Sequence, residues 1–232
     1  MNILMSNDDG VYAPGIKALN HFVSQKVSTT VIAPTTERST TGHSLNLDSP
    51  LRLEKIKDNV YGCTGFPADC VLMGLGNVCR DRRPDMVFSG INRGANLGQD
   101  LYYSGTLAAA REATFHGVPA VGFSLVYSDV RETLDYEGAA QFAAFLVELE
   151  VQKYIPELTL LDVNYPNIPR DEIRGVKLTT VGLRNYSEVV EHRVDSRERD
   201  YYWVVGDIRP STQDENTDCQ AIADKYISIT PP

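Results

Sequence analysis

Short apolar runs alternate with amphipathic stretches along most of the chain. Five apolar runs bounded by turn-forming residues are typical of buried strands: residues 2–6, 28–34, 85–90, 120–126 and 158–166. Four stretches between them carry apolar residues at helical spacing: residues 14–25, 67–79, 106–117 and 136–151. Apolar strands that alternate with helices indicate a parallel sheet covered on both faces. We therefore predict an α/β fold, a Rossmann-like three-layer α/β/α architecture with a mostly parallel sheet.

Two segments depart from this alternation. Residues 51–65 hold two strand-like runs separated by Lys57 and Asp58, which predicts an antiparallel excursion. Beyond residue 184 the chain reads as two strands joined by a charged turn, without an obvious core of its own. We predict a Rossmann-like domain over residues 1–184 and a C-terminal β-hairpin arm over residues 185–232. The arm is expected to pack on this domain or on a neighbouring subunit.

Net charge, apolar runs and cysteine spacing limit the binding partners and the cellular locations that we expect. The chain has 232 residues and a net charge of -9, so it gains no long-range attraction to polyanions, and we expect no nucleic-acid partner. No apolar run approaches the ~18 residues of a membrane span, and the start lacks the pattern of a signal peptide. Four cysteines match neither a zinc nor a redox spacing, which predicts free thiols in the cytoplasm: Cys63, Cys70, Cys79 and Cys219.

Three polar stretches follow predicted strands at the ends where open parallel sheets bind ligands. They are "SNDDG" after the strand 2–6, "TTERSTTGHS" after 28–34, and "SGINRGANLGQDLYYSGT" after 85–90. The first two, taken singly, also fit plain turns or polar loops. The third fits a plain loop poorly, because loops of this length are usually functional and it ends in Ser-Gly-Thr before a helix.

The adjacent carboxylates of Asp8 and Asp9 suggest the chemistry. Two like charges about 4 Å apart repel by roughly 4 kcal/mol at an effective dielectric near 20, so a half-buried pair needs a proton or a cation. Carboxylate, amide and hydroxyl oxygens suit Mg²⁺ or Mn²⁺ better than zinc. Together with a glycine-rich anion cradle, they favour metal-assisted hydrolysis of a phosphate ester.

Two other classes of function compete with this hydrolase. A nucleotide-binding module that holds phosphate without hydrolysing it remains an alternative, although a pure anion site favours Arg or Lys over paired carboxylates. A nicotinamide dehydrogenase is excluded because no G-x-G-x-x-G follows the first strand.

Five motifs resemble the SurE family of survival-protein nucleotidases: "NDDGVYAPGI", "ERSTTGHSL", "GFPADCV", "SGINRGANLGQDLYYSGTLAAAREA" and "YISITPP". They occur in family order and span nearly the whole chain. The resemblance implies a divalent-metal-dependent phosphatase that acts on nucleoside 5′- and 3′-monophosphates, and in some members on short polyphosphate. It also implies a Rossmann-like fold whose C-terminal arm is exchanged within a homodimer or homotetramer.

The resemblance also assigns residues. It implies one Mg²⁺ or Mn²⁺ ion per subunit, held by Asp8, Asp9, Ser39 and Asn92. Phosphate-pocket positions are implied for Asn96, Ser104, Gly105 and Thr106. The expected catalytic residues are Asp8, Asp9, Asn96, Ser104 and Thr106.

Two further side chains leave alternatives open. His43 fits either a proton donor or a loop histidine that only hydrogen-bonds. Arg93 fits either a phosphate ligand or a solvated loop arginine.

Overall fold

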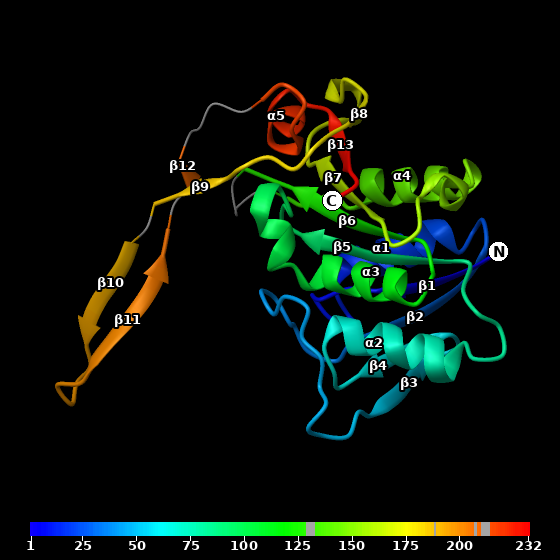
Figure 1. Cartoon of the computed structure of the whole chain (residues 1–232), viewed down its shortest axis with the longest axis horizontal. Coiled ribbons are helices and arrows are strands. Elements are labelled where there is room, and N and C mark those ends of the chain that lie inside the picture. Colours follow the sequence, from blue (N-terminus) through cyan, green and yellow to red (C-terminus); the bar gives the residue numbers. More distant parts are fainter. Residues whose placement is uncertain (129–132, 188, 207, 210–213) are drawn as a thin grey trace.

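A nine-stranded sheet forms the centre of the computed structural model (Figure 1), which describes residues 1–128, 133–187, 189–206, 208–209 and 214–232. The strand order is β3-β4-β2-β1-β5-β6-β7-β13-β8. Its strands are β1 Asn2–Ser6, β2 Ser28–Pro34, β3 Leu53–Lys57, β4 Val60–Cys63, β5 Met86–Arg93, β6 Ala120–Val126, β7 Leu160–Pro166, β8 Val176–Leu178 and β13 Ile227–Thr230.

The middle of this sheet is parallel. Strand β1 pairs in parallel with β2 and with β5, and the parallel series continues through β6 to β7. Antiparallel pairs occur between β3 and β4 and between β7 and β13. The first of these pairs confirms the predicted excursion, with a turn at Asp58 and Asn59.

Helices cover both faces of the sheet. Their bounds are α1 Pro14–Val23, α2 Pro67–Met73, α3 Gly105–Phe115, α4 Glu137–Glu148 and α5 Asp218–Ala223. One core cluster packs the apolar sides of α1 and α4 on the sheet, and a second cluster packs α2 and α3. The two clusters hold different side chains of the same strands, because successive residues of a strand point to opposite faces. The three-layer, mostly parallel Rossmann-like prediction is therefore confirmed (Figure 1).

Several predicted ends differ from the structure by one to three residues, and two differences are of another kind or affect the site. The stretch 67–79 is α-helical only to Met73 and continues as a π-helix over Gly74–Val78, closed by a bond from the Cys79 amide to the Gly74 carbonyl. Strand β5 runs to Arg93 and not to residue 90, because a register shift after Ser89 lets the chain pair again with β6. Asn92 therefore lies on a strand and not in the following loop.

Two strands of the C-terminal arm form a hairpin that extends away from the sheet (Figure 1), as the sequence predicts. We call β10 Val189–Val194 and β11 Asp200–Val205 the hairpin; β9 Asn185–Tyr186 and β12 Ile208–Arg209 pair at its base. The end of the arm returns to the body, where β13 lies between β7 and β8. The sequence reading did not predict this strand, and the domain boundary at residue 184 stays a prediction.

Candidate active site

The site lies where the strand order reverses direction. Strand β1 is followed by α1 and leads to β2 on one side, whereas β5, on the other side of β1, is reached later in the chain. Crevices at such switch points, outside the carboxyl ends of the strands, are where open α/β sheets bind ligands. The pairing of Ser6 with Ser89 places the residues after β1 beside the end of β5. Asp8, Asp9 and Asn92 thus come together although they are far apart in sequence.

Asp8 is buried against the first turn of α3. Its Oδ1 accepts a hydrogen bond of 2.5 Å from the Thr106 hydroxyl, and only 4% of the residue is exposed. The positive end of a helix dipole favours a carboxylate at this place. Gly105 leaves room for it, because a Cβ there would lie 2.8 Å from Cβ and 2.9 Å from Oδ2 of Asp8.

The second carboxylate is held from β5. The Arg93 amide donates to Oδ2 of Asp9 at 3.1 Å. Burial, and then the charge of Asp8, raise the pKa of Asp9 to about 6. Burial also raises the pKa of Asp8, against the hydrogen bonds from Thr106 that lower it. Glu37 adds negative charge beside both carboxylates, and Arg93 adds positive charge beside Asp9, so negative charge exceeds positive charge in this cluster.

The other two predicted metal ligands add neutral oxygens. Ser39 is exposed, and its hydroxyl donates to Oε1 of Glu37 at 2.6 Å. The Asn92 amide nitrogen donates to the Gly94 carbonyl at 2.9 Å, which orients the amide group. Carboxylate, hydroxyl and amide oxygens are the donor set of a hard cation. In the part of the chain that the structure describes, no group of three or more His, Cys, Asp or Glu residues is placed to hold a metal ion, so the predicted ligand set depends on the neutral oxygens of Ser39 and Asn92 as well as on the two carboxylates.

A cavity of about 510 Å³ opens above these residues. It is lined by five of the predicted residues: Asp8, Ser39, Asn92, Asn96 and Ser104. Ser104 is the N-cap of α3, and its hydroxyl oxygen accepts from the Leu107 amide at 3.1 Å. The side-chain Nδ2 of Asn96 donates to the Ser124 hydroxyl at 2.8 Å. Asp9, Gly105 and Thr106 lie beside the cavity through their contacts with Arg93 and Asp8.

Several residues of the site were missed by the sequence reading. Glu37 belongs to the motif "ERSTTGHS", and its acid near the pair is a signal that the sequence does offer. Tyr186, at the base of the arm, lines the cavity and donates its hydroxyl to Asp100. Asp100 also accepts from Arg184 at 2.5 Å. No local motif marks Tyr186, because only the fold brings the arm to this edge.

His43 is fixed to α3 and not directed to the cavity. Its Nε2 lies 2.7 Å from Oε2 of Glu112, and its ring stacks on Phe115 with centroids 5.6 Å apart. This contact favours the interpretation of His43 as a hydrogen-bonding loop residue. It also ties the loop that carries Ser39 to the helix that holds Asp8.

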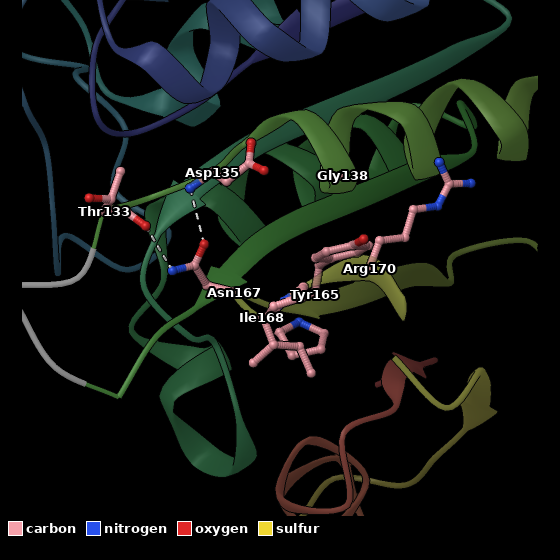
Figure 2. Close-up of a pocket in the computed structure, with 9 residues that line it drawn as sticks. Thr133, Asp135, Gly138, Tyr165, Asn167, Ile168 and Arg170 are labelled. Atoms are coloured by element: carbon pink, nitrogen blue, oxygen red, sulfur yellow. Dashed lines mark hydrogen bonds between the residues drawn. The ribbon is translucent and has the colours of Figure 1, made fainter. Parts of the chain in front are cut away.

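A second cavity, of about 290 Å³, lies at the start of α4 (Figure 2). There the Asn167 side chain accepts from the Asp135 amide at 3.0 Å and donates to the Thr133 carbonyl at 3.1 Å. Asp135 in turn accepts from the amide of Glu137, the first residue of α4. These polar groups satisfy one another, and the convergent carboxylates of the first cavity have no counterpart among the residues drawn.

Comparison with known proteins identifies the family. The model of the family described as "Survival protein SurE" matches residues 3–188. This chain belongs to the SurE family. Two relatives called 5′-nucleotidase SurE, from Thermosipho melanesiensis and Geotalea daltonii, are 45% and 44% identical to it. Each alignment covers 100% of this chain, and it covers 91% and 92% of the respective relative.

A solved structure supports the same conclusion about the fold. The SurE protein from Aquifex aeolicus is 38% identical and superposes with a TM-score of 0.89, over 100% of this chain and 93% of the other. The fold of the SurE family is therefore the Rossmann-like α/β/α architecture that the sequence predicted.

Proposed function

We propose that this protein is a divalent-metal-dependent phosphatase that hydrolyses nucleoside 5′- and 3′-monophosphates, and short polyphosphate as a further substrate. The observation that carries the proposal is the adjacent carboxylates of buried Asp8 and partly buried Asp9 beside a cavity at the switch point of the sheet. The SurE relatives at 41–45% identity are named as 5′-nucleotidases, which supports the substrate class. A volume of about 510 Å³ is in the usual range for small-molecule sites.

Asp8, Asp9, Ser39 and Asn92 are the residues that would hold one Mg²⁺ or Mn²⁺ ion. The bound ion would supply Lewis-acid polarisation of the phosphate and make a water molecule more acidic. Asp8 is kept in place by Thr106, and Asp9 by the Arg93 amide. The shortage of positive charge around them fits this role, because unpaired carboxylates are costly to bury.

The chain's own groups then act on the phosphate. Ser104 directs a hydroxyl into the cavity while it caps α3, and the start of that helix favours an anion. Asn96, which is also buried, lines the same cavity. One of the two carboxylates accepts the proton of the attacking water. Donors aimed at the charge that develops on the phosphoryl oxygens lower the barrier, and each is typically worth ~10²–10³ in turnover.

The test is release of inorganic phosphate from 5′-AMP, 3′-AMP and tripolyphosphate, with Mg²⁺, with Mn²⁺ and with EDTA. We expect release with metal and none with EDTA. Binding of 5′-AMP without release under every metal would contradict the enzyme and favour a nucleotide-binding module. A single turnover in ¹⁸O-labelled water distinguishes attack by water from attack by an aspartate, because only the second route labels a carboxylate.

The proposal includes a homodimer or homotetramer formed through the C-terminal arm. Hairpin side chains support it: Tyr202 is 59% exposed, Trp203 55% and Val204 88%. Clustered exposed apolar groups of this kind mark interaction sites. A cytoplasmic location is part of the same proposal, supported by four free cysteines. Among the described helices, none has the length and apolar character needed to cross a membrane.

A further inference from the structure

The loop that carries Asn96 is hydrogen-bonded to Asp218, which lies 120 positions after Gly98 in the chain. The Gly98 amide donates to Oδ2 of Asp218 at 2.8 Å. Asp218 is the first residue of α5 and is fully buried. Burying a carboxylate costs free energy unless hydrogen bonds replace its hydration. The hydrogen bonds to Asp218 are therefore needed for the fold to keep this residue buried.

The other oxygen of the same carboxylate reaches the arm. Oδ1 of Asp218 accepts from the Gly182 amide at 2.8 Å and from the Cys219 amide at 2.7 Å. Gly182 lies three residues before β9, where the arm begins. The loop and the arm also touch directly: Gly98 has φ +55, and a Cβ there would lie 3.0 Å from the Gly182 carbonyl oxygen. One side chain therefore joins the phosphate-pocket loop, the root of the arm and α5.

A second buried side chain holds the Asn96 peptide groups themselves. Oδ1 of Asn164, on β7, accepts from the Asn96 amide at 2.9 Å, and its Nδ2 donates to the Asn96 carbonyl at 3.3 Å. Asn164 also donates to Oδ2 of Asp162 at 3.1 Å. Burial, and then the charge of Asp218, raise the pKa of Asp162 well above its ordinary value.

We propose that Asp218 and Asn164 are positioning residues that hold the loop 96–98 in place against the phosphate, and that Asp218 couples this loop to the root of the C-terminal arm. This inference rests on the proposed phosphatase function and adds two residues that no motif of the site contains. Neither side chain lines the cavity, so both act through the loop.

A carboxylate suits this role better than its amide. Asp218 receives three backbone amides on two oxygens, and hydrogen bonds to a charged acceptor are stronger than neutral ones. Asn in its place keeps one oxygen acceptor and presents an NH₂ group to an amide that is itself a donor. The Gly98 or Gly182 amide is then unsatisfied, and the loop shifts to relieve it. A shift of about 1 Å at a catalytic group can cost ~100-fold in rate.

The experiment compares Asp218→Asn with two variants on the same helix. Thr217→Ala removes the N-cap whose hydroxyl oxygen accepts from the Gln220 amide, and it leaves the three bonds to Asp218 in place. Asp224→Asn makes the same chemical change at the far end of α5, at a partly exposed residue. For each variant, kcat and KM are measured with 5′-AMP and Mn²⁺, together with the melting temperature.

We expect Asp218→Asn to lower kcat by roughly 10- to 100-fold while KM changes less than threefold, because the loop contact matters most in the transition state. Thr217→Ala and Asp224→Asn should keep kcat within twofold of the parent chain. Thr217→Ala should nevertheless lower the melting temperature, so that a general loss of stability is separated from the loss of positioning.

If Asp218→Asn is not recovered folded, Asn164→Ser tests the same loop through its second contact, with the same expected fall in kcat. A kcat for Asp218→Asn no lower than that of the two control variants would overturn the inference, as would parental kcat in Asn164→Ser. Failure of the proposed function looks different: in that case the unaltered chain and both control variants release no phosphate with any metal.

Discussion

The carboxyl edge of the sheet and the hairpin are unusual in opposite ways: the edge buries a charged group, and the hairpin exposes apolar side chains to water. At the edge, Asp8 is 4% exposed although charged groups are rarely buried without a partner. On the hairpin, Val204 is 88% exposed and Trp203 55%, although apolar side chains gain by leaving water. Each arrangement is costly to an isolated chain.

The difference teaches what kind of partner each region fits. An acidic pair of which one member is buried is compensated by positive charge, and its oxygen donors select a hard cation. An exposed apolar strand is compensated by another apolar surface, and an unpaired hairpin edge also offers backbone groups. The two regions meet at the base of the arm, where Tyr186 lines the cavity and Gly182 bonds to Asp218. The following variants test whether the two kinds of cost are independent.

The largest effect is expected for Asp8→Asn. Removing a metal-binding carboxylate should lower metal-dependent turnover by more than the ~100-fold typical of a residue that only supports a ligand. Because burial raises the pKa of Asp8, the neutral amide should leave the melting temperature in EDTA equal to or above that of the parent. Phosphate release and thermal melting check both statements. Asp48→Asn, at an exposed acid, is the control, and near-parental turnover in Asp8→Asn would refute the metal assignment.

Gly105→Ala tests the space that the edge reserves for Asp8. The added Cβ would lie 2.8 Å from Cβ of Asp8, closer than real Cβ atoms approach, so the carboxylate must move. We expect a fall in kcat of roughly 10- to 100-fold, the range for misplacing a catalytic group by about 1 Å.

The matched control for this change is Gly76→Ala, where an added Cβ meets nothing within 4 Å. It should leave kcat unchanged. Equal turnover in the two alanine variants would show that the close contact at Asp8 does not matter for the reaction.

The sequence predicted most of this edge because its residues follow strand ends. Asp8 and Asp9 follow the end of β1 after one residue, Asn92 is the last but one residue of β5, and Ser104 caps α3, so local pattern and parallel topology together bring them to one place. The contacts of Asp218 and Tyr186 with this edge could not be predicted in this way. Their contacts join segments 120 and 86 positions apart, and they depend on β13 entering the sheet beside β7. A four-residue strand carries too little periodicity to predict that pairing.

Acid should weaken metal binding at the edge. Because the pKa of Asp9 is raised to about 6, a proton competes with the ion below that pH, and affinity should fall roughly tenfold per pH unit for one displaced proton. Calorimetric titration with Mn²⁺ at several pH values measures this slope. An affinity independent of pH between about 5 and 6 would contradict the assignment of Asp9 as a ligand.

The same raised pKa has a consequence for the metal-free protein. Between the ordinary value of 3.8 and about 6, the folded state binds more protons at Asp9 than the unfolded state does. Stability from this group is therefore lost as pH rises through that window. Asp9→Asn should flatten the corresponding part of the profile of melting temperature against pH in EDTA. An unchanged slope in the variant would place the proton elsewhere.

The smallest effect on turnover is expected from the hairpin. Val204→Lys places a charge on β11 at a residue that is 88% exposed, which should dissociate the oligomer to a single chain of 25.7 kDa in light scattering. Since no described contact joins Val204 to the cavity, kcat per subunit should stay within twofold. Tyr154→Ser, at a residue 78% exposed on the body, is the control and should leave the mass unchanged. If the parent chain already has the mass of one subunit, the exposed hairpin serves another partner. If Val204→Lys also abolishes turnover, the carboxyl edge and the hairpin form one functional unit, joined through the root of the arm.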